Sequence, residues 1–146
     1  MIYLEVNQKI GKKIPKFFWQ FWLNKTVRIL KIKKKFEVSV AVVNDESIKK
    51  LNRIFRGKNK VTDVLSFAES EGQIKFFGDK NFLGEIIICY PQAVRQAKAF
   101  RHDVAQEIAN LLIHGFLHLL GYDDQTEKQS KVMEELAEKI IKGKIK

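Results

Sequence analysis

Four short segments of the chain have the residue pattern of β-strands. MIYLEVN at the N-terminus and FEVSVAVVN at 36–44 alternate apolar and polar residues with a period of two, and VLSFAE at 64–69 is a short apolar run. LGEIIICY at 83–90 is almost continuously apolar, as expected of a strand that is covered on both faces. The pattern therefore predicts four strands, the last of them in the centre of a sheet.

Elsewhere, apolar residues recur every three or four positions, which is typical of helices that bury one face. The helices predicted in this way cover 14–32, 44–55, 91–102, 104–121 and 126–142. Asn44, Asp103 and the segment TEKQ at 126–129 provide side chains that cap helix starts, and Gly57 and Gly121 are suited to helix ends. The apolar positions of the first helix include aromatic residues that are expected to lie mainly in the core, with stacking on nucleic-acid bases as the alternative: Phe17, Phe18, Trp19, Phe21 and Trp22.

Two further segments do not fit either period. RGKNKVTD at 56–63 is predicted to be a basic loop, and SEGQIKFFGDKN at 70–81 a hairpin-like excursion or a loop. The resulting order of elements, β-α-β-α-β-β-α-α-α, indicates an α/β (α+β) fold with a mixed, mostly parallel four-stranded sheet surrounded by about five helices. No linker divides the 146 residues, so we expect a single domain over 1–146.

Composition narrows the class of protein. Hydrophobic residues make up 45% of the chain, which is enough for one buried core. The single cysteine, Cys89, excludes an internal disulfide and fits a reducing compartment, where we expect it to be a small buried apolar residue. No apolar run approaches the roughly 18 residues that span a bilayer, and the N-terminus lacks the pattern of a signal peptide. The sequence predicts a soluble cytoplasmic protein that does not bind a membrane.

Positive charge is concentrated near the N-terminus. The net charge is +10, and the segment 1–36 holds ten Lys or Arg residues but a single acidic residue, Glu5. A local excess of this kind attracts polyanions, and phosphate contacts give affinity that is independent of base sequence. A lysine-rich solvated face without a partner is the alternative, and the scarcity of arginine there weakens any expectation of base-specific recognition.

The segment HGFLHLLGYDD at 114–124 has the spacing of a metal site. His114 and His118 are four residues apart on a predicted helix, so both imidazoles lie on one face and can reach one ion. Gly121 ends the helix and lets the chain fold back, which brings Asp123 or Asp124 toward the same ion. Two core histidines without a ligand are the alternative, but the glycine and the following carboxylates favour metal binding.

This spacing is that of the metzincin metal-site helix, with one omission. In metzincins a glutamate follows the first histidine and acts as general base, whereas Gly115 occupies that position here. Peptidase activity of that type is therefore not expected. An iron oxygenase with a two-histidine, one-carboxylate site is also disfavoured, because such sites usually lie in barrels with many strands.

Three segments in the right order resemble the YbeY endoribonuclease family. HGFLHLLGYDD resembles the family signature H-G-x-L-H-L-x-G-Y-D-H, and FRGKNKVTDVLSF at 55–67 resembles a second motif that begins R-G-K. LGEIIIC at 83–89 matches the family's strand before the helical half. The resemblance extends over nearly the whole chain, and the combination is far more specific than a histidine pair alone.

The resemblance implies a set of metal ligands. Two of the family's metal histidines fall on His114 and His118, and its third histidine falls on Asp124. An aspartate can still bind Zn²⁺ through oxygen, so one zinc ion held by these three residues is expected. The carboxylate also suits iron, manganese or nickel better than a third imidazole would. Asp123 matches the family's aspartate and is expected to support the ligands by hydrogen bonding or to compete as a ligand itself.

The resemblance also implies a substrate-binding group. The family's functional arginine falls on Arg56, beside Lys58 and Lys60 in the predicted basic loop. A guanidinium can bind a phosphate at two points and stabilise the charge that develops during phosphodiester cleavage, so we expect Arg56 to be catalytic as well as substrate-binding. His102 falls where the family often has a histidine and is expected to support the ligands or the substrate.

The function implied by the resemblance is a metal-dependent endoribonuclease, a hydrolase that cuts single-stranded RNA. It would act in maturation of the 3′ end of 16S ribosomal RNA and in ribosome quality control. Its partners would be single-stranded RNA and the small ribosomal subunit, with a ribosomal protein or a ribosome-associated GTPase as further candidates. The alternative is a non-catalytic ribosome-biogenesis factor that binds RNA and holds a structural metal.

Overall fold

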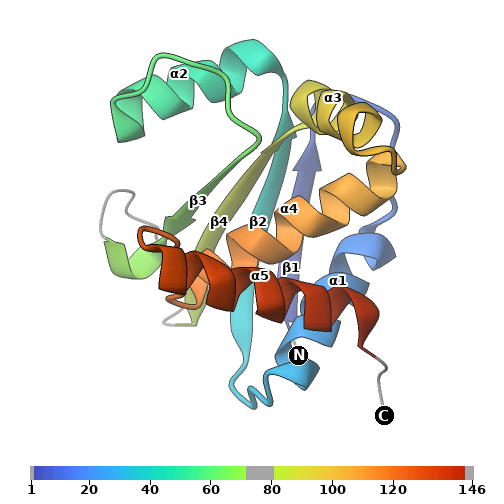
Figure 1. Ribbon diagram of the computed structural model, residues 1–146, viewed down its shortest axis with the longest axis vertical. Coiled ribbons are helices and arrows are strands. Elements are labelled where there is room, and N and C mark those ends of the chain that lie inside the picture. The colour runs from blue at the N-terminus through green and yellow to red at the C-terminus, as the bar shows by residue number, and fades with distance from the viewer. Residues whose placement is uncertain (1, 72–80, 144–146) are drawn as a thin grey trace.

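A four-stranded mixed sheet forms the centre of the molecule in the computed structural model, which describes residues 2–71 and 81–143 (Figure 1). Its strands are β1 (Ile2–Gln8), β2 (Phe36–Val43), β3 (Val64–Ala68) and β4 (Phe82–Cys89). Their order is β1-β2-β4-β3; the first two pairings are parallel, and β3 runs antiparallel to β4. The predicted mixed, mostly parallel sheet is confirmed. Most of the predicted excursion at 70–81 lies outside the described residues.

The described residues form five helices around this sheet, as predicted. They are α1 (Lys16–Ile29), α2 (Asp45–Arg56), α3 (Tyr90–Phe100), α4 (Val104–Leu119) and α5 (Glu127–Lys142), and a short 3₁₀ turn covers Glu69–Glu71. Helix α1 ends earlier than predicted. Lys31 adopts a left-handed conformation with φ of 58°, and the N–H of Ile32 donates back to the carbonyl of Val27, which closes the helix.

The helices form layers on both faces of the sheet (Figure 1). Helices α1 and α4 pack on one face over a core that includes Val40, Ile86 and Leu112, and α5 packs outside α4. Helix α2 covers the other face near β3 and β4, where Ile48 and Phe67 are buried. Strand β4 is therefore covered on both sides, which explains its continuous apolar sequence.

Side-chain caps start three of the helices at the predicted residues. Asn44 accepts a hydrogen bond from the N–H of Ser47, and Asp103 accepts one from Gln106. At the start of α5, Thr126 and Gln129 form a reciprocal capping box. These caps satisfy N–H groups that have no partner within the helix, and so determine where α2, α4 and α5 begin.

The expectation that all the aromatic residues of α1 lie mainly in the core is wrong for two of them. Trp19 is fully buried, whereas the side chains of Phe17 and Phe21 are 75% and 46% exposed. The two phenylalanines are four residues apart and so share one helix face, which points away from the sheet. A segment in which nearly every position is apolar does not show by periodicity which face is buried.

Cys89 is buried at the end of β4, as predicted. Burial raises the pKa of its thiol to about 12, so the reactive thiolate is absent at neutral pH. Among the described residues, no helix combines the length and the apolar character that a membrane span requires.

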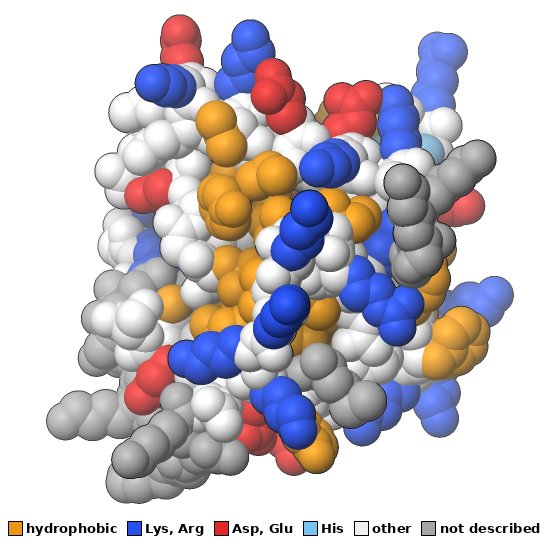
Figure 2. All heavy atoms as spheres, turned by 90° about the horizontal axis from the view of Figure 1, so that it is seen from below, with side chains coloured by type: hydrophobic (Ala, Val, Ile, Leu, Met, Phe, Trp, Pro, Cys, Tyr) orange, Lys and Arg blue, Asp and Glu red, His pale blue; other side chains and the backbone are white. Residues whose placement is uncertain are grey.

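The N-terminal basic residues outside α1 include two groups at opposite ends of the sheet. Lys9, Lys12 and Lys13 follow β1, whereas Lys33 and Lys35 precede the parallel strand β2. Seen from below, Lys and Arg side chains lie around and across a band of apolar surface (Figure 2). The charge that is continuous in the sequence is therefore split in space.

Candidate metal centre

Helix α4 positions the two histidines on adjacent turns of one face. Their Nε2 atoms are 3.2 Å apart, and both side chains are half-buried. The opposite face of the same helix is buried against the sheet, where Leu112 and Phe116 have no exposed surface. Packing of α4 therefore fixes the direction in which both imidazoles point.

A tight bend after α4 brings Asp124 to the histidines. Gly121 has φ of +106°, a conformation that favours glycine, and the N–H of Tyr122 donates back to the carbonyl of Leu117. As a result, Oδ2 of Asp124 lies 3.5 Å from Nε2 of His114 and 3.7 Å from Nε2 of His118. Asp123 is turned differently, because its Oδ1 accepts a hydrogen bond from the N–H of Asp124.

The three ligand atoms have the spacing of a metal site. Bonds of 2.0–2.2 Å in a tetrahedral arrangement place neighbouring ligand atoms roughly 3.3–3.5 Å apart. The three distances observed here, 3.2, 3.5 and 3.7 Å, are close to that value. One divalent ion could therefore bind His114, His118 and Asp124 together with little movement of the side chains.

The surroundings of His114 favour its neutral form, which is the form that binds metal. Burial lowers the pKa of its imidazole, and the neighbouring His118 lowers it further. The carboxylates of Asp124 and Asp63 oppose these effects by attracting positive charge. Asp63 is thus close enough to act on His114, although it lies on the connection between α2 and β3.

The three residues open into a cavity of about 970 Å³. Arg56, Lys58 and Lys60 line this cavity, so the structure brings the predicted phosphate-binding residues to the same place as the predicted ligands. Two contacts hold the guanidinium of Arg56. Its Nη2 donates to the carbonyl of Ser66 at 2.7 Å, and its Cζ lies 4.8 Å from the centre of the Phe67 ring. Such contacts orient a guanidinium for planar recognition.

Asn52 organises the basic loop that carries the two lysines. Its side chain is buried, its Nδ2 donates to the carbonyl of Lys60, and its own carbonyl accepts from the N–H of Lys58. An internal residue of α2 therefore shapes the loop on the rim of the cavity. The described residues that line the cavity include none of the N-terminal lysines.

Asp123 and His102, which were predicted to support the ligands, lie outside the group of three side chains that could bind one ion. Asp123 lines the cavity but is outside the group that could bind one ion. His102 does not line the cavity; its Nε2 is 2.7 Å from Oε1 of the buried Glu107. Asp63, which does line the cavity, was missed by the sequence analysis. The signal that could have found it is its place in the motif shared with Arg56.

Gly115 lies on the buried side of α4, against the sheet. A Cβ atom added there would lie 2.8 Å from Cγ2 of Ile86, closer than packing allows. No larger side chain fits at this position without displacement of Ile86 or of the helix. The absence of a glutamate beside the first histidine is thus built into the contact between α4 and β4.

Fold and site together define an α/β protein in which two side chains of a helix and one from the bend after it could bind a metal, open to a basic cavity. The family model described as Endoribonuclease YbeY matches residues 4–144. This chain belongs to the Endoribonuclease YbeY family.

Individual relatives agree with this assignment. The chain is 50% identical over 113 residues to Endoribonuclease YbeY of Moorella thermoacetica, covering 73% of this chain and 72% of the relative. It is 39% identical over 123 residues to Endoribonuclease YbeY of Syntrophomonas wolfei, covering 81% and 79%. The solution structure of TM1509 from Thermotoga maritima superposes with a TM-score of 0.60 at 31% identity, covering 97% of this chain and 87% of that one.

Proposed function

We propose that the chain is a metal-dependent endoribonuclease that cuts single-stranded RNA. The observation that supports this most directly is the ligand triangle of His114, His118 and Asp124, which opens into the cavity lined by Arg56. A cation site beside fixed positive charge suits a phosphodiester substrate. Relatives that carry the name Endoribonuclease YbeY are 39% and 50% identical to this chain over 79% and 72% of their own length.

We assign the three side chains as ligands of one Zn²⁺ ion. When bound, such an ion supplies a Lewis acid with an open coordination position. Asp124 adds negative charge to the ligand set, so it should favour oxygen-preferring metals such as Mn²⁺ more than a third imidazole would. Asp123 positions the backbone of Asp124 through the hydrogen bond to its N–H.

Arg56 binds the phosphate next to the bond that is cut. The Ser66 carbonyl and the Phe67 ring hold its guanidinium at the cavity, where it can bind two phosphate oxygens at once. Lys58 and Lys60 add positive charge on the same loop and contact flanking phosphates. The fixed guanidinium stabilises the additional negative charge that appears as the phosphodiester reacts.

In the cell, we place this activity in the maturation of the 3′ end of 16S ribosomal RNA and in ribosome quality control, in the cytoplasm. The partners would be single-stranded RNA and the small ribosomal subunit, reached directly or through a ribosomal protein or a ribosome-associated GTPase. The resemblance of the motifs to those of the family supports this assignment.

Cleavage of a labelled single-stranded RNA tests the enzymatic function. We expect His114→Ala and Arg56→Ala each to lower the cleavage rate by about 100-fold or more, because the first removes a proposed metal ligand and the second removes the guanidinium proposed to bind the phosphate. Arg53→Ala is the matched control, since Arg53 is an exposed arginine one turn earlier on α2 and does not line the cavity. Equal rates in all four proteins would reject the site.

Elemental analysis tests the metal and separates the proposal from its alternative. We expect close to one zinc ion per chain in the wild type, retention of zinc in Asp124→His, and loss of most of it in Asp124→Ala. If chelation instead lowers the melting temperature strongly while RNA is bound but never cut, the chain is a binding factor with a structural metal.

A further inference from the structure

A series of hydrogen-bonded side chains connects the interior of the protein with the wall of the cavity. Nε2 of His102 contacts Oε1 of Glu107 at 2.7 Å, and Nε2 of Gln96 donates to Oε2 of the same carboxylate at 2.6 Å. Nε2 of Gln96 also donates to Oδ2 of Asp63 at 3.3 Å. Glu107 is 4% exposed, so this end of the hydrogen-bonded series lies in the interior of the protein.

Every polar atom of the Gln96 side chain has a partner. Its two N–H groups face the two carboxylates, and its Oε1 accepts from Nε2 of Gln92 at 3.1 Å. An amide used in this way has one orientation, because a flip would place its oxygen against both carboxylates. Gln96 therefore links the buried Glu107 of α4 to Asp63 at the cavity.

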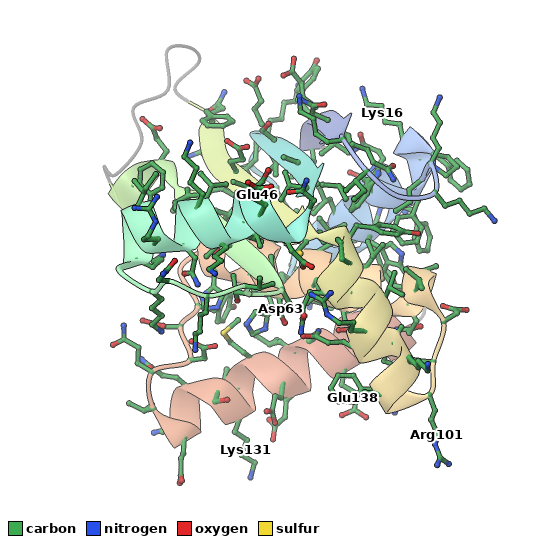
Figure 3. The ribbon with its side chains drawn as sticks, turned by 90° about the horizontal axis from the view of Figure 1, so that it is seen from above. Lys16, Glu46, Asp63, Arg101, Lys131 and Glu138 are labelled. Carbon is green, nitrogen blue, oxygen red and sulfur yellow. The ribbon has the colours of Figure 1, made fainter. Side chains whose placement is uncertain are left out.

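Asp63 is held from its other side by the backbone. Its Oδ1 accepts from the N–H of Val64 at 2.8 Å, and its carbonyl accepts from the N–H of Cys89 at 2.9 Å. In Figure 3 it lies among the side chains between α2, α3 and α4, whereas Arg101 and Lys131 lie at the periphery. The carboxylate is thus fixed in the wall of the cavity that also contains Arg56 and His114.

A carboxylate at this place matches a hydrogen-bond donor in the substrate. Arg56, Lys58 and Lys60 attract phosphates, which are acceptors, whereas the Asp63 carboxylate repels them. Within an RNA strand the backbone has one kind of donor, the ribose 2′-hydroxyl, and DNA lacks it. An aspartate beside a phosphate-binding arginine therefore has the chemistry needed to distinguish ribose from deoxyribose.

We propose that Asp63 accepts a hydrogen bond from a ribose 2′-hydroxyl next to the phosphate bound by Arg56, and that Gln96 and Glu107 are positioning residues that hold Asp63 for this contact. The proposal rests on the proposed endoribonuclease function and deepens it. Asp63 determines specificity for RNA, and α3 contributes to the site through Gln96 without reaching the cavity wall itself.

The test is a binding measurement with an oligonucleotide pair that differs at one group. A short single-stranded RNA is compared with its 2′-fluoro counterpart, which keeps the ribose pucker but cannot donate, by fluorescence anisotropy on the full-length protein. Binding is recorded within the first seconds after mixing, before cleavage proceeds, so that the protein keeps any metal it holds. We expect the wild type to bind the RNA about tenfold more tightly, as for a hydrogen bond to a charged acceptor.

Variants then test whether the preference for the RNA over the 2′-fluoro strand depends on Asp63. Asp63→Asn keeps an oxygen for the N–H of Val64, and we expect it to reduce the preference to about twofold or less. We expect Gln96→Ala to give an intermediate preference, because Asp63 is retained but loses its link to Glu107. Glu46→Gln, an exposed carboxylate on α2 outside the cavity, is the control; it should alter both affinities equally and keep the tenfold ratio. Circular dichroism establishes that each variant is folded.

Two results would overturn the proposal: a wild type that does not distinguish the two strands, or a folded Asp63→Asn that keeps the full preference. Either result, with RNA cleavage by the wild type intact, would leave the endoribonuclease function standing and remove the role of Asp63. Absence of cleavage would instead count against the proposed function, so the two failures are distinguishable.

Discussion

Glu85 shows how one residue can carry a pH-dependent cost to stability. It lies on β4 beside Ser39 of β2, and Ser39 pairs in turn with Glu5 of β1. Burial raises the pKa of the Glu85 carboxyl above its ordinary value of 4.5. The folded protein therefore binds the proton of this group more tightly than the unfolded chain does, and the charged form destabilises the fold.

We expect Glu85→Gln to stabilise the protein at neutral pH. A raised pKa in the folded state means that the cost is absent below pH 4.5 and fully present above the folded-state value. The gain at pH 7 should be less than about 1 kcal/mol, because water screens this partly exposed group. Urea unfolding at pH 7 and pH 4 measures it, with the exposed Glu5→Gln as control. A gain that persists at pH 4 would contradict this assignment of its cause.

Individual residues also mark what the sequence can predict about a site. His114, His118 and Asp124 fall within one segment, so their spacing alone predicts that they meet. Asp63, which lines the cavity, and Gln96, which does not, come from separate segments that only the fold brings into contact, and neither has a spacing relative to the histidines that indicates contact. Contacts that tertiary packing assembles have no signal in residue spacing, and for Asp63 the signal is the motif that it shares with Arg56.

At the scale of elements, the contact between α4 and β4 is unusually close. It passes through Gly115, where an added Cβ would meet Ile86 at 2.8 Å. Because His114 is the preceding residue on the same helix, the separation of helix and sheet also sets the height of the imidazole above the cavity. Packing and metal geometry are therefore coupled at this position.

We expect Gly115→Ala to lower the free energy of unfolding by about 1–3 kcal/mol and to weaken zinc binding, because α4 must move away from the sheet. Thermal denaturation and zinc titration measure the two effects. Gly57→Ala is the control: Gly57 has φ of +69° with no atom within 4 Å of an added Cβ, so that variant should lose stability but bind zinc normally. Unchanged zinc affinity in Gly115→Ala would contradict the prediction that the packing of α4 affects zinc binding.

The existence and type of the elements were predictable, whereas their arrangement was less so. Capping residues and a buried strand have local patterns, so Asn44, Asp103 and the continuous apolar run of β4 were enough to predict α2, α4 and a central strand. The insertion of β4 between β2 and β3 depends on contacts between distant segments. The end of α1 depends on the backbone conformation at Lys31, a residue type that does not usually signal a left-handed turn.

For the whole molecule, the distribution of charge predicts two separate contributions to RNA binding. Arg56, Lys58 and Lys60 line the cavity, whereas the described N-terminal lysines lie elsewhere, at both ends of the sheet. A short strand that fills the cavity should contact the first group alone, and a longer RNA should contact both. The net charge of +10 therefore does not act as a single patch.

The salt dependence of the affinity for a six-nucleotide single-stranded RNA tests whether the two groups of basic residues act separately. In the double variant Lys58→Ala and Lys60→Ala, the slope of log affinity against log salt concentration should become shallower by about 1.4, or roughly 0.7 for each lost phosphate contact. The double variant Lys33→Ala and Lys35→Ala removes the same charge outside the cavity and should keep the wild-type slope. Equal changes in the two variants would show that the short strand does not bind in the cavity.

The bend between α4 and α5 leaves one ligand outside regular structure. His114 and His118 are fixed by a packed helix, but Asp124 lies in the short connection that ends at the capping box of Thr126. A change at this position alters the donor atom while the core, the sheet and the caps keep their contacts. The metal preference of the proposed site can therefore change by a single codon, and a descendant of this chain could adapt to a different supply of metals while keeping the same fold.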